Sequence, residues 1–289
     1  MQKSSKLQPS IAAIPLTILG LLLVAVALRR FIPIGDDWRN VFHGLPILHP
    51  YIYNAIRDPW AKVSYPPWIM LLLPHTQLDI SIGNAINFFL NLIIPMAVIA
   101  KMTRPQSTGY GYRKHVYTAI FLTYTSPFYL QLLATNNVEW IPLLAFLVPE
   151  TFAGVFLVCK PQAIGGALLI FIKRTRGLVL MPILVLVVLS FFVWPGWLSE
   201  IRMPSMDAVV NIAPFPLMIP LGLYLLWRAW KEDDEVLAAS ATPFLVPYMT
   251  FYAASANMVL IASRYQKIAW FIWLAAWALV GVAVRFTLL

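Results

Sequence analysis

The stretch IAAIPLTILGLLLVAVAL, residues 11–28, contains no charged side chain and is long enough to cross a lipid bilayer as a helix. It runs into Arg29-Arg30 without a small-residue cleavage site, so we interpret it as an uncleaved first span and not as a signal peptide. The whole chain is 60% hydrophobic and 11% charged, whereas soluble domains average about 45–50% and about 25%. This composition predicts an all-α, polytopic integral membrane protein.

Further apolar runs predict about 9–11 transmembrane or half-penetrating helices in a single transmembrane domain, residues 1–289. The expected spans are 11–28, 79–100, 113–134, 178–194, 215–227 and 267–289, with shorter proline-broken helices over 138–172 and 236–262. Basic residues near the helix ends, such as Lys3, Lys6 and Lys173, place the N-terminus in the cytoplasm and the loop 29–77 outside the plasma membrane. The 23 prolines favour broken helices, which a membrane tolerates where the freed backbone is buried in protein or lines a cavity.

The external loop 29–77 carries the chain's densest mixture of acids, bases, histidines and aromatic residues. Asp36 and Asp37 stand where the first helix leaves the bilayer, and carboxylates beside hydrocarbon are costly to keep without a use. We expect one of them to be a general base for an attacking hydroxyl, and we slightly prefer Asp36 because it is closer to the apolar segment. The alternative is a solvated loop start in which Asp37 pairs with Arg39 or Arg30.

The tripeptide Lys160-Pro161-Gln162 interrupts another apolar stretch. A lysine at the centre of a membrane helix costs about 2.5–3.5 kcal/mol on insertion scales. We therefore expect Lys160 to have a partner, which is either a carboxylate or the phosphate of a lipid ligand. The alternative is a lysine whose ammonium reaches an interface along its aliphatic stem.

Other polar residues could bind a substrate, although each taken singly is also typical of a surface or packing residue. They are Arg57, Lys62, His43, His49 and Tyr65 in the external loop, Asn136 and Asn137 near the outer end of a span, and Gln162. A sugar could find hydrogen bonds and a stacking face at Asn136, Asn137, Glu139 and Trp140. Helix capping with an aromatic belt residue is the alternative there.

The sequence predicts no cofactor. Asp36, Asp37, His43 and His49 lack the spacing of a zinc site, and a divalent cation that bridges a phosphate and a carboxylate is the alternative. Basic residues are scattered among the loops, so the net charge of +9 favours anionic membrane lipid and not nucleic acid as a partner. The single cysteine, Cys159, excludes an internal disulfide.

Taken in order, these motifs resemble the polytopic glycosyltransferases of the GT-C superfamily, and most closely glycosyltransferase family 87, the polyprenyl-phosphate-mannose-dependent mannosyltransferases. The matching residues are Gly35-Asp36-Asp37, Tyr65-Pro66-Pro67, Asn136-Asn137, Lys160-Pro161-Gln162, and Thr242-Pro243-Phe244 through Tyr248. The chain is shorter than typical members, and it has Asn-Asn where the family often has Gly-Gln.

The resemblance implies an inverting transfer of a mannose-type hexose from a polyprenyl phosphate to a hydroxyl acceptor outside the cell membrane. Asp36 or Asp37 would be the base, and Lys160 with Arg57 or Lys62 would hold the donor phosphate. Fixed cations there stabilise the negative charge that develops as the glycosidic bond breaks. Two alternatives stay open: a non-catalytic subunit of a larger membrane complex, and a lipid or solute transporter that uses the broken helices.

Overall fold

The structure is a computed structural model that describes residues 20, 23–48, 65–103, 109–200 and 211–287. All named elements in this described part are helical, and one isolated bridge pairs Asn211 with Thr250. The predicted all-α class is therefore confirmed for these residues. Most of the predicted first span, 11–28, lies outside them, as do the candidate ligands Arg57, Lys62 and His49.

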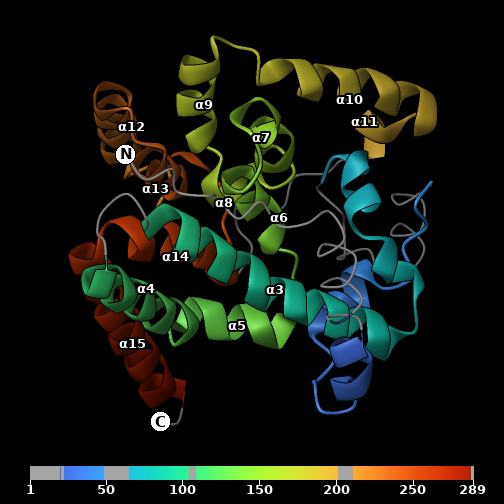
Figure 1. The fold of residues 1–289 in the computed structure, drawn as a ribbon, viewed down its shortest axis with the longest axis horizontal. Coiled ribbons are helices and arrows are strands. Elements are labelled where there is room, and N and C mark those ends of the chain that lie inside the picture. The colour runs from blue at the N-terminus through green and yellow to red at the C-terminus, as the bar shows by residue number, and fades with distance from the viewer. Residues whose placement is uncertain (1–19, 21–22, 49–64, 104–108, 201–210, 288–289) are drawn as a thin grey trace, which may run out of the picture.

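Many of the described helices follow one another through short turns (Figure 1). In chain order they are η1 (Trp38–Phe42), η2 (Pro67–Leu72), η3 (Pro74–Gln77), α3 (Ile80–Thr103), α4 (Gly109–Tyr124), α5 (Pro127–Thr135), α6 (Trp140–Leu143), η5 (Leu144–Phe146), α7 (Glu150–Leu157), α8 (Pro161–Ile164), α9 (Ala167–Thr175), α10 (Leu180–Val193), α11 (Trp197–Glu200), α12 (Ile219–Glu232), α13 (Glu235–Leu245), η6 (Phe251–Ala253), α14 (Ala254–Arg264) and α15 (Gln266–Thr287). The broken, short helices predicted over 138–172 and 236–262 are confirmed.

One predicted span is divided in the structure. The segment 113–134 forms α4 and α5, with a break at Ser126. The Ser126 side chain caps α5 by accepting a hydrogen bond from the Tyr129 amide, and Pro127 occupies the first turn of that helix. Proline removes an amide donor and disfavours a helical residue before it, so this pair starts a new helix inside an apolar run.

Two described helices are long and apolar enough to cross a membrane, namely α3 and residues Gln266–Arg285 of α15. The pair α9 and α10 would supply a third if counted as one span, although it is bent by 111°. The 9–11 helices predicted include half-penetrating ones and the first span, most of which lies outside the described residues, so the described part has fewer full spans than the apolar runs suggested. The difference arises because prolines and helix caps divide the apolar runs, and the 16 residues of α4 reach only about 24 Å against a core of about 30 Å.

Helix α14 packs against four other helices, α3, α4, α13 and α15 (Figure 1). Its residues Ser255–Ser263 are all buried. By contrast α10, α12 and α15 expose large apolar side chains, among them Phe192 at 80% and Phe271 at 72%. Apolar outer faces of this extent suit contact with hydrocarbon.

Charged side chains from three chain segments meet at one end of the fold. Arg174 on α9 pairs with Glu150 at 3.1 Å, with Asp233 at 3.0 Å and with Glu235 at 2.7 Å. Lys173 lies 3.3 Å from Asp233. These residues join the start of α7, the end of α9 and the turn between α12 and α13, which the predicted topology assigns to one side of the membrane.

Candidate functional site

Three asparagines on one face of α3 hold two distant backbone segments together. Asn84, Asn87 and Asn91 are fully buried in an otherwise apolar helix. Asn84 Oδ1 accepts from the Gly35 amide at 3.2 Å, and Asn87 donates to the Asn136 carbonyl at 2.8 Å. A buried amide without partners costs free energy, so these hydrogen bonds specify how the acidic loop and the Asn136 turn approach each other.

Gly35 lets the acidic loop pass directly over that turn. A Cβ atom at this position would lie 2.3 Å from the Thr135 carbonyl oxygen and 2.6 Å from Asn136 Cβ. Both neighbours are close to rigid, because Asn136 is left-handed (φ 52°) and tied to α3 through Asn84.

We therefore expect Gly35→Ala to lower the free energy of unfolding by about 1–3 kcal/mol, the usual range for overpacking a core. The measurement is thermal or denaturant unfolding of the detergent-solubilised protein. Gly281→Ala on α15 is the control, since its Cβ would meet nothing within 4 Å. Equal stability of the two variants would contradict the close approach at Gly35.

Asn137 is the central residue of the polar network that follows. Its Nδ2 donates to Asp37 Oδ2 at 2.7 Å and to the Tyr252 hydroxyl at 3.1 Å. Its Oδ1 accepts from Lys160 Nζ at 2.6 Å and from the Val138 amide at 2.7 Å. Both ends of the amide are therefore used, and its orientation is fixed by Lys160.

Lys160 forms a buried ion pair with Glu139, and the two side chains are 2% and 0% exposed. The ammonium also lies 5.5 Å from the centre of the Tyr65 ring and 5.3 Å from that of Tyr252, where the ring faces attract a cation. The partner expected for the buried Lys160 ammonium is therefore a carboxylate, that of Glu139. The burial also excludes the alternative of a lysine reaching an interface.

The two candidate bases, Asp36 and Asp37, differ in their relation to this network. Asp37 is half-buried and directly bonded to it, while the neighbouring Asp36 is exposed. For the role of general base, the structure thus favours Asp37, whereas the sequence slightly favoured Asp36. Within the described residues Asp37 forms no ion pair with Arg30 or Arg39.

Tyr65, Asn136 and Asn137 are buried in or beside the network, and Gln162 is half-buried. His43 lies half-buried with its Nε2 3.3 Å from the Leu78 carbonyl oxygen. None of the described segments brings three His, Cys, Asp or Glu side chains into a group that could hold a metal ion.

Glu139 was not predicted as the counter-ion of Lys160, and Tyr252 was not predicted as part of the site. It also passed over the asparagines of α3, although their spacing of three and four residues inside an apolar run was a readable signal. Glu139 and Lys160 are 21 residues apart in the chain, and the path of α6, η5 and α7 between them brings them together.

His75 packs behind the acidic loop, with its ring stacked on Trp38 at 5.1 Å between centroids. Burial lowers the pKa of His75 to about 4 from a usual 6.5, and the nearby side chain of Asn87 opposes this shift only in part. The folded protein therefore holds His75 neutral, while the unfolded chain takes up a proton below pH 6.5.

Stability should therefore fall as the pH drops from 6.5 to about 4, by about 3 kcal/mol from this group. His75→Phe keeps a stacked ring without a titrating group, so its unfolding free energy should depend less on pH over that window. Parallel pH profiles for wild type and His75→Phe would show that His75 is not responsible.

Comparisons of the chain with protein-family models, with curated proteins and with solved structures find no match. The chemistry of the site therefore rests on its own geometry. A half-buried carboxylate, held by a fixed amide next to a buried ion pair, is an arrangement that can accept a proton from a bound hydroxyl.

Proposed function

We propose that this protein is a polytopic membrane glycosyltransferase of GT-C type, which moves a mannose-type hexose from a polyprenyl phosphate to a hydroxyl acceptor outside the cell membrane. The observation that carries the proposal is the carboxylate of Asp37. Asn137 holds its Oδ2 at 2.7 Å, yet the residue is only half-buried and can reach a substrate. The hydrogen bond orients the base without neutralising it.

The charge balance of the network supports a role at the sugar end of the donor. Asp37, Glu139 and Lys160 together carry one negative charge, and they lie within a single hydrogen-bonded chain. Glycosyl transfer develops positive charge on the sugar ring, which such a site stabilises. A phosphate would be repelled there, so we assign the donor phosphate to cations of the loop 29–77, Arg57 and Lys62.

Lys160 then has a different role from the phosphate ligand that the resemblance implies. Its ammonium is used by Glu139 and by Asn137 Oδ1. Because it fixes which end of the Asn137 amide faces Asp37, Lys160 is a positioning residue for the base. Glu139 holds Lys160 in turn.

A second feature favours a substrate over a purely structural role. Oε2 of Glu139 is buried and has no hydrogen-bond partner among the described residues. Buried polar atoms are nearly always paired in a folded protein, so an unpaired carboxylate oxygen in the network of Asp37 is more typical of a functional site than of a structural ion pair.

The competing function is a non-catalytic subunit packed in a larger membrane complex. The observation in its favour is that Lys160 already has its counter-ion within the chain. Such a subunit needs no accessible base.

The experiment is a transfer assay with purified protein in proteoliposomes that contain mannosyl-phosphoryl-polyprenol labelled in the sugar, with octyl mannoside as acceptor. We expect label to move from the polyprenol to the octyl mannoside, in an amount proportional to the amount of protein in the proteoliposomes. Label that stays on the polyprenol, together with a stoichiometric membrane protein that co-purifies with the native chain, would establish the subunit function instead.

A further inference from the structure

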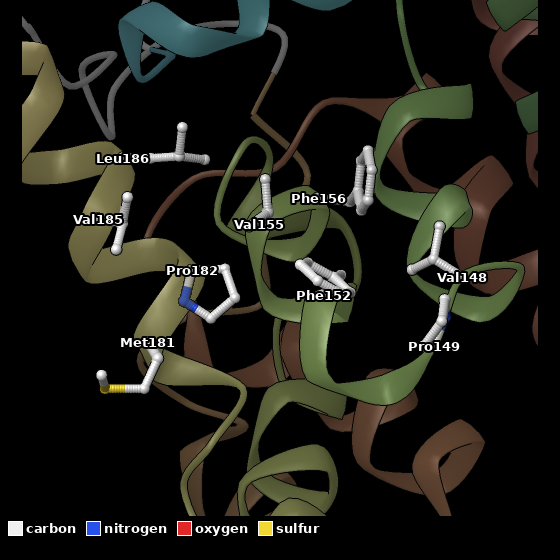
Figure 2. Close-up of a pocket in the computed structure, with 9 residues that line it drawn as sticks. All are labelled: Val148, Pro149, Phe152, Val155, Phe156, Met181, Pro182, Val185 and Leu186. Carbon is white, nitrogen blue, oxygen red and sulfur yellow. The ribbon is translucent and has the colours of Figure 1, made fainter.

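A second surface feature is an open groove between α7 and α10, with a volume of about 670 Å³. Its walls are two rows of apolar side chains that face each other across the gap (Figure 2). Phe152, Val155 and Phe156 come from α7, and Met181, Val185 and Leu186 come from α10. All nine lining residues are apolar, so the groove offers a ligand no polar side chain.

The groove is open to the outside of the fold. Phe152 is 53% exposed and Val185 is 54% exposed, which is unusual for facing walls of one cleft. The bend of 111° between α9 and α10 leaves this space, because α10 leaves the bundle there instead of packing along α9. Exposing a wholly apolar surface of this kind to water is unfavourable, so the groove suits contact with hydrocarbon.

Charged residues adjoin the groove lining in the chain at one end. The lining residue Pro149 precedes Glu150, whose carboxylate binds Arg174. Arg176 lies two residues further on, in the left-handed turn that joins α9 to α10, and the lining residue Met181 follows five residues later. Arg174 is occupied by three carboxylates, whereas Arg176 is exposed and forms no ion pair within the described part of the chain.

We propose that the α7–α10 groove holds one acyl chain of an anionic phospholipid, whose phosphate pairs with Arg176. The apolar lining selects a hydrocarbon chain, because a polar ligand or an extended peptide would leave its own polar groups unpaired there. The guanidinium at the end of the groove selects a phosphate with negative charge, since its fork matches phosphate oxygens. This site does not depend on the transferase activity.

A polyprenyl donor chain is the rival occupant, and the charges argue against it. α7 ends at Leu157, and the residue three positions later, Lys160, belongs to the network of Asp37. A donor in the groove would place its phosphate at that end, next to a network with a net negative charge. At the opposite end, the charges of Lys173, Arg174 and Arg176 balance those of Glu150, Asp233 and Glu235, so no net negative charge opposes a phosphate there.

The experiment measures lipid retained by the purified full-length protein, released from nanodiscs made of equal parts phosphatidylglycerol and phosphatidylcholine, by native mass spectrometry. We expect wild type to retain one phosphatidylglycerol and to prefer it several-fold over phosphatidylcholine. Val155→Trp fills the groove and should abolish retention, while Leu189→Trp on the exposed face of α10 is the matched control. Arg176→Gln should keep a lipid but lose the preference for phosphatidylglycerol.

Retention that survives Val155→Trp, or that falls equally in Leu189→Trp, would overturn the groove as the site. Equal retention of the two phospholipids by wild type would overturn the role of Arg176. Val185→Trp fills the same groove from the other wall and replaces Val155→Trp if that variant does not fold. In a further arm, polyprenyl phosphate that displaces phosphatidylglycerol from wild type and Arg176→Gln alike would overturn the proposal in favour of the donor chain.

Discussion

Replacing Asp37 with asparagine is expected to lower sugar transfer by about 10²–10⁴-fold, the usual cost of losing a positioned general base. Asparagine has the same shape as aspartate, and its amide oxygen can accept the hydrogen bond from Asn137, so the fold should be unchanged. The assay is the rate of transfer from mannosyl-phosphoryl-polyprenol, with the melting temperature as a check of folding.

Asp36 provides a control that differs from Asp37 by one position in the chain. It is exposed and lies outside the hydrogen-bonded network, so Asp36→Asn should retain transfer close to that of wild type. The two variants make the same change in charge. A loss of activity in Asp36→Asn with full activity in Asp37→Asn would show that Asp36 is the base. Full activity in both variants would show that neither aspartate is.

Glu139→Gln is expected to destabilise the protein by about 3–5 kcal/mol, because it leaves the Lys160 ammonium buried without a counter-ion. Lys160→Met should cost about as much, since it leaves the Glu139 carboxylate unpaired. The measurement is denaturant unfolding in detergent micelles.

The double variant Glu139→Leu with Lys160→Met separates stability from function. Apolar replacement of a whole buried ion pair is often neutral or stabilising, so the double variant should recover most of the lost stability. Its transfer activity should stay low, because Asn137 Oδ1 loses the donor that fixes the amide toward Asp37. Single variants as stable as wild type, or a fully active double variant, would contradict this role for the pair.

The helices could largely be predicted from the sequence, because their signals are local. The apolar run 79–100 and the described part of 267–289 form α3 and α15 as expected, and prolines mark the breaks in 138–172. The division of 113–134 was missed because the long apolar run outweighed a single Ser-Pro pair, although that pair carries both a cap and a proline.

The site could be predicted only in part, because its signals are not local. Asp37 and Lys160 were identified singly, by their cost in an apolar environment, and Asn137 by its place near the outer end of a predicted span. Their connection was not, because a hydrogen bond between residues 100 positions apart depends on how α3 holds the two loops. For the same reason Glu139 was missed as the partner of Lys160, and proximity to the first span misleadingly favoured Asp36.

The most direct test is a cryo-electron microscopy structure of the full-length protein with mannosyl-phosphoryl-polyprenol bound, using Asp37→Asn to prevent turnover. We expect the mannose ring beside residue 37 and Asn137, the phosphate toward the cations of the loop 29–77, and the Lys160–Glu139 pair intact. A donor bound away from residue 37, or a phosphate on Lys160 with Glu139 displaced, would contradict the proposed site.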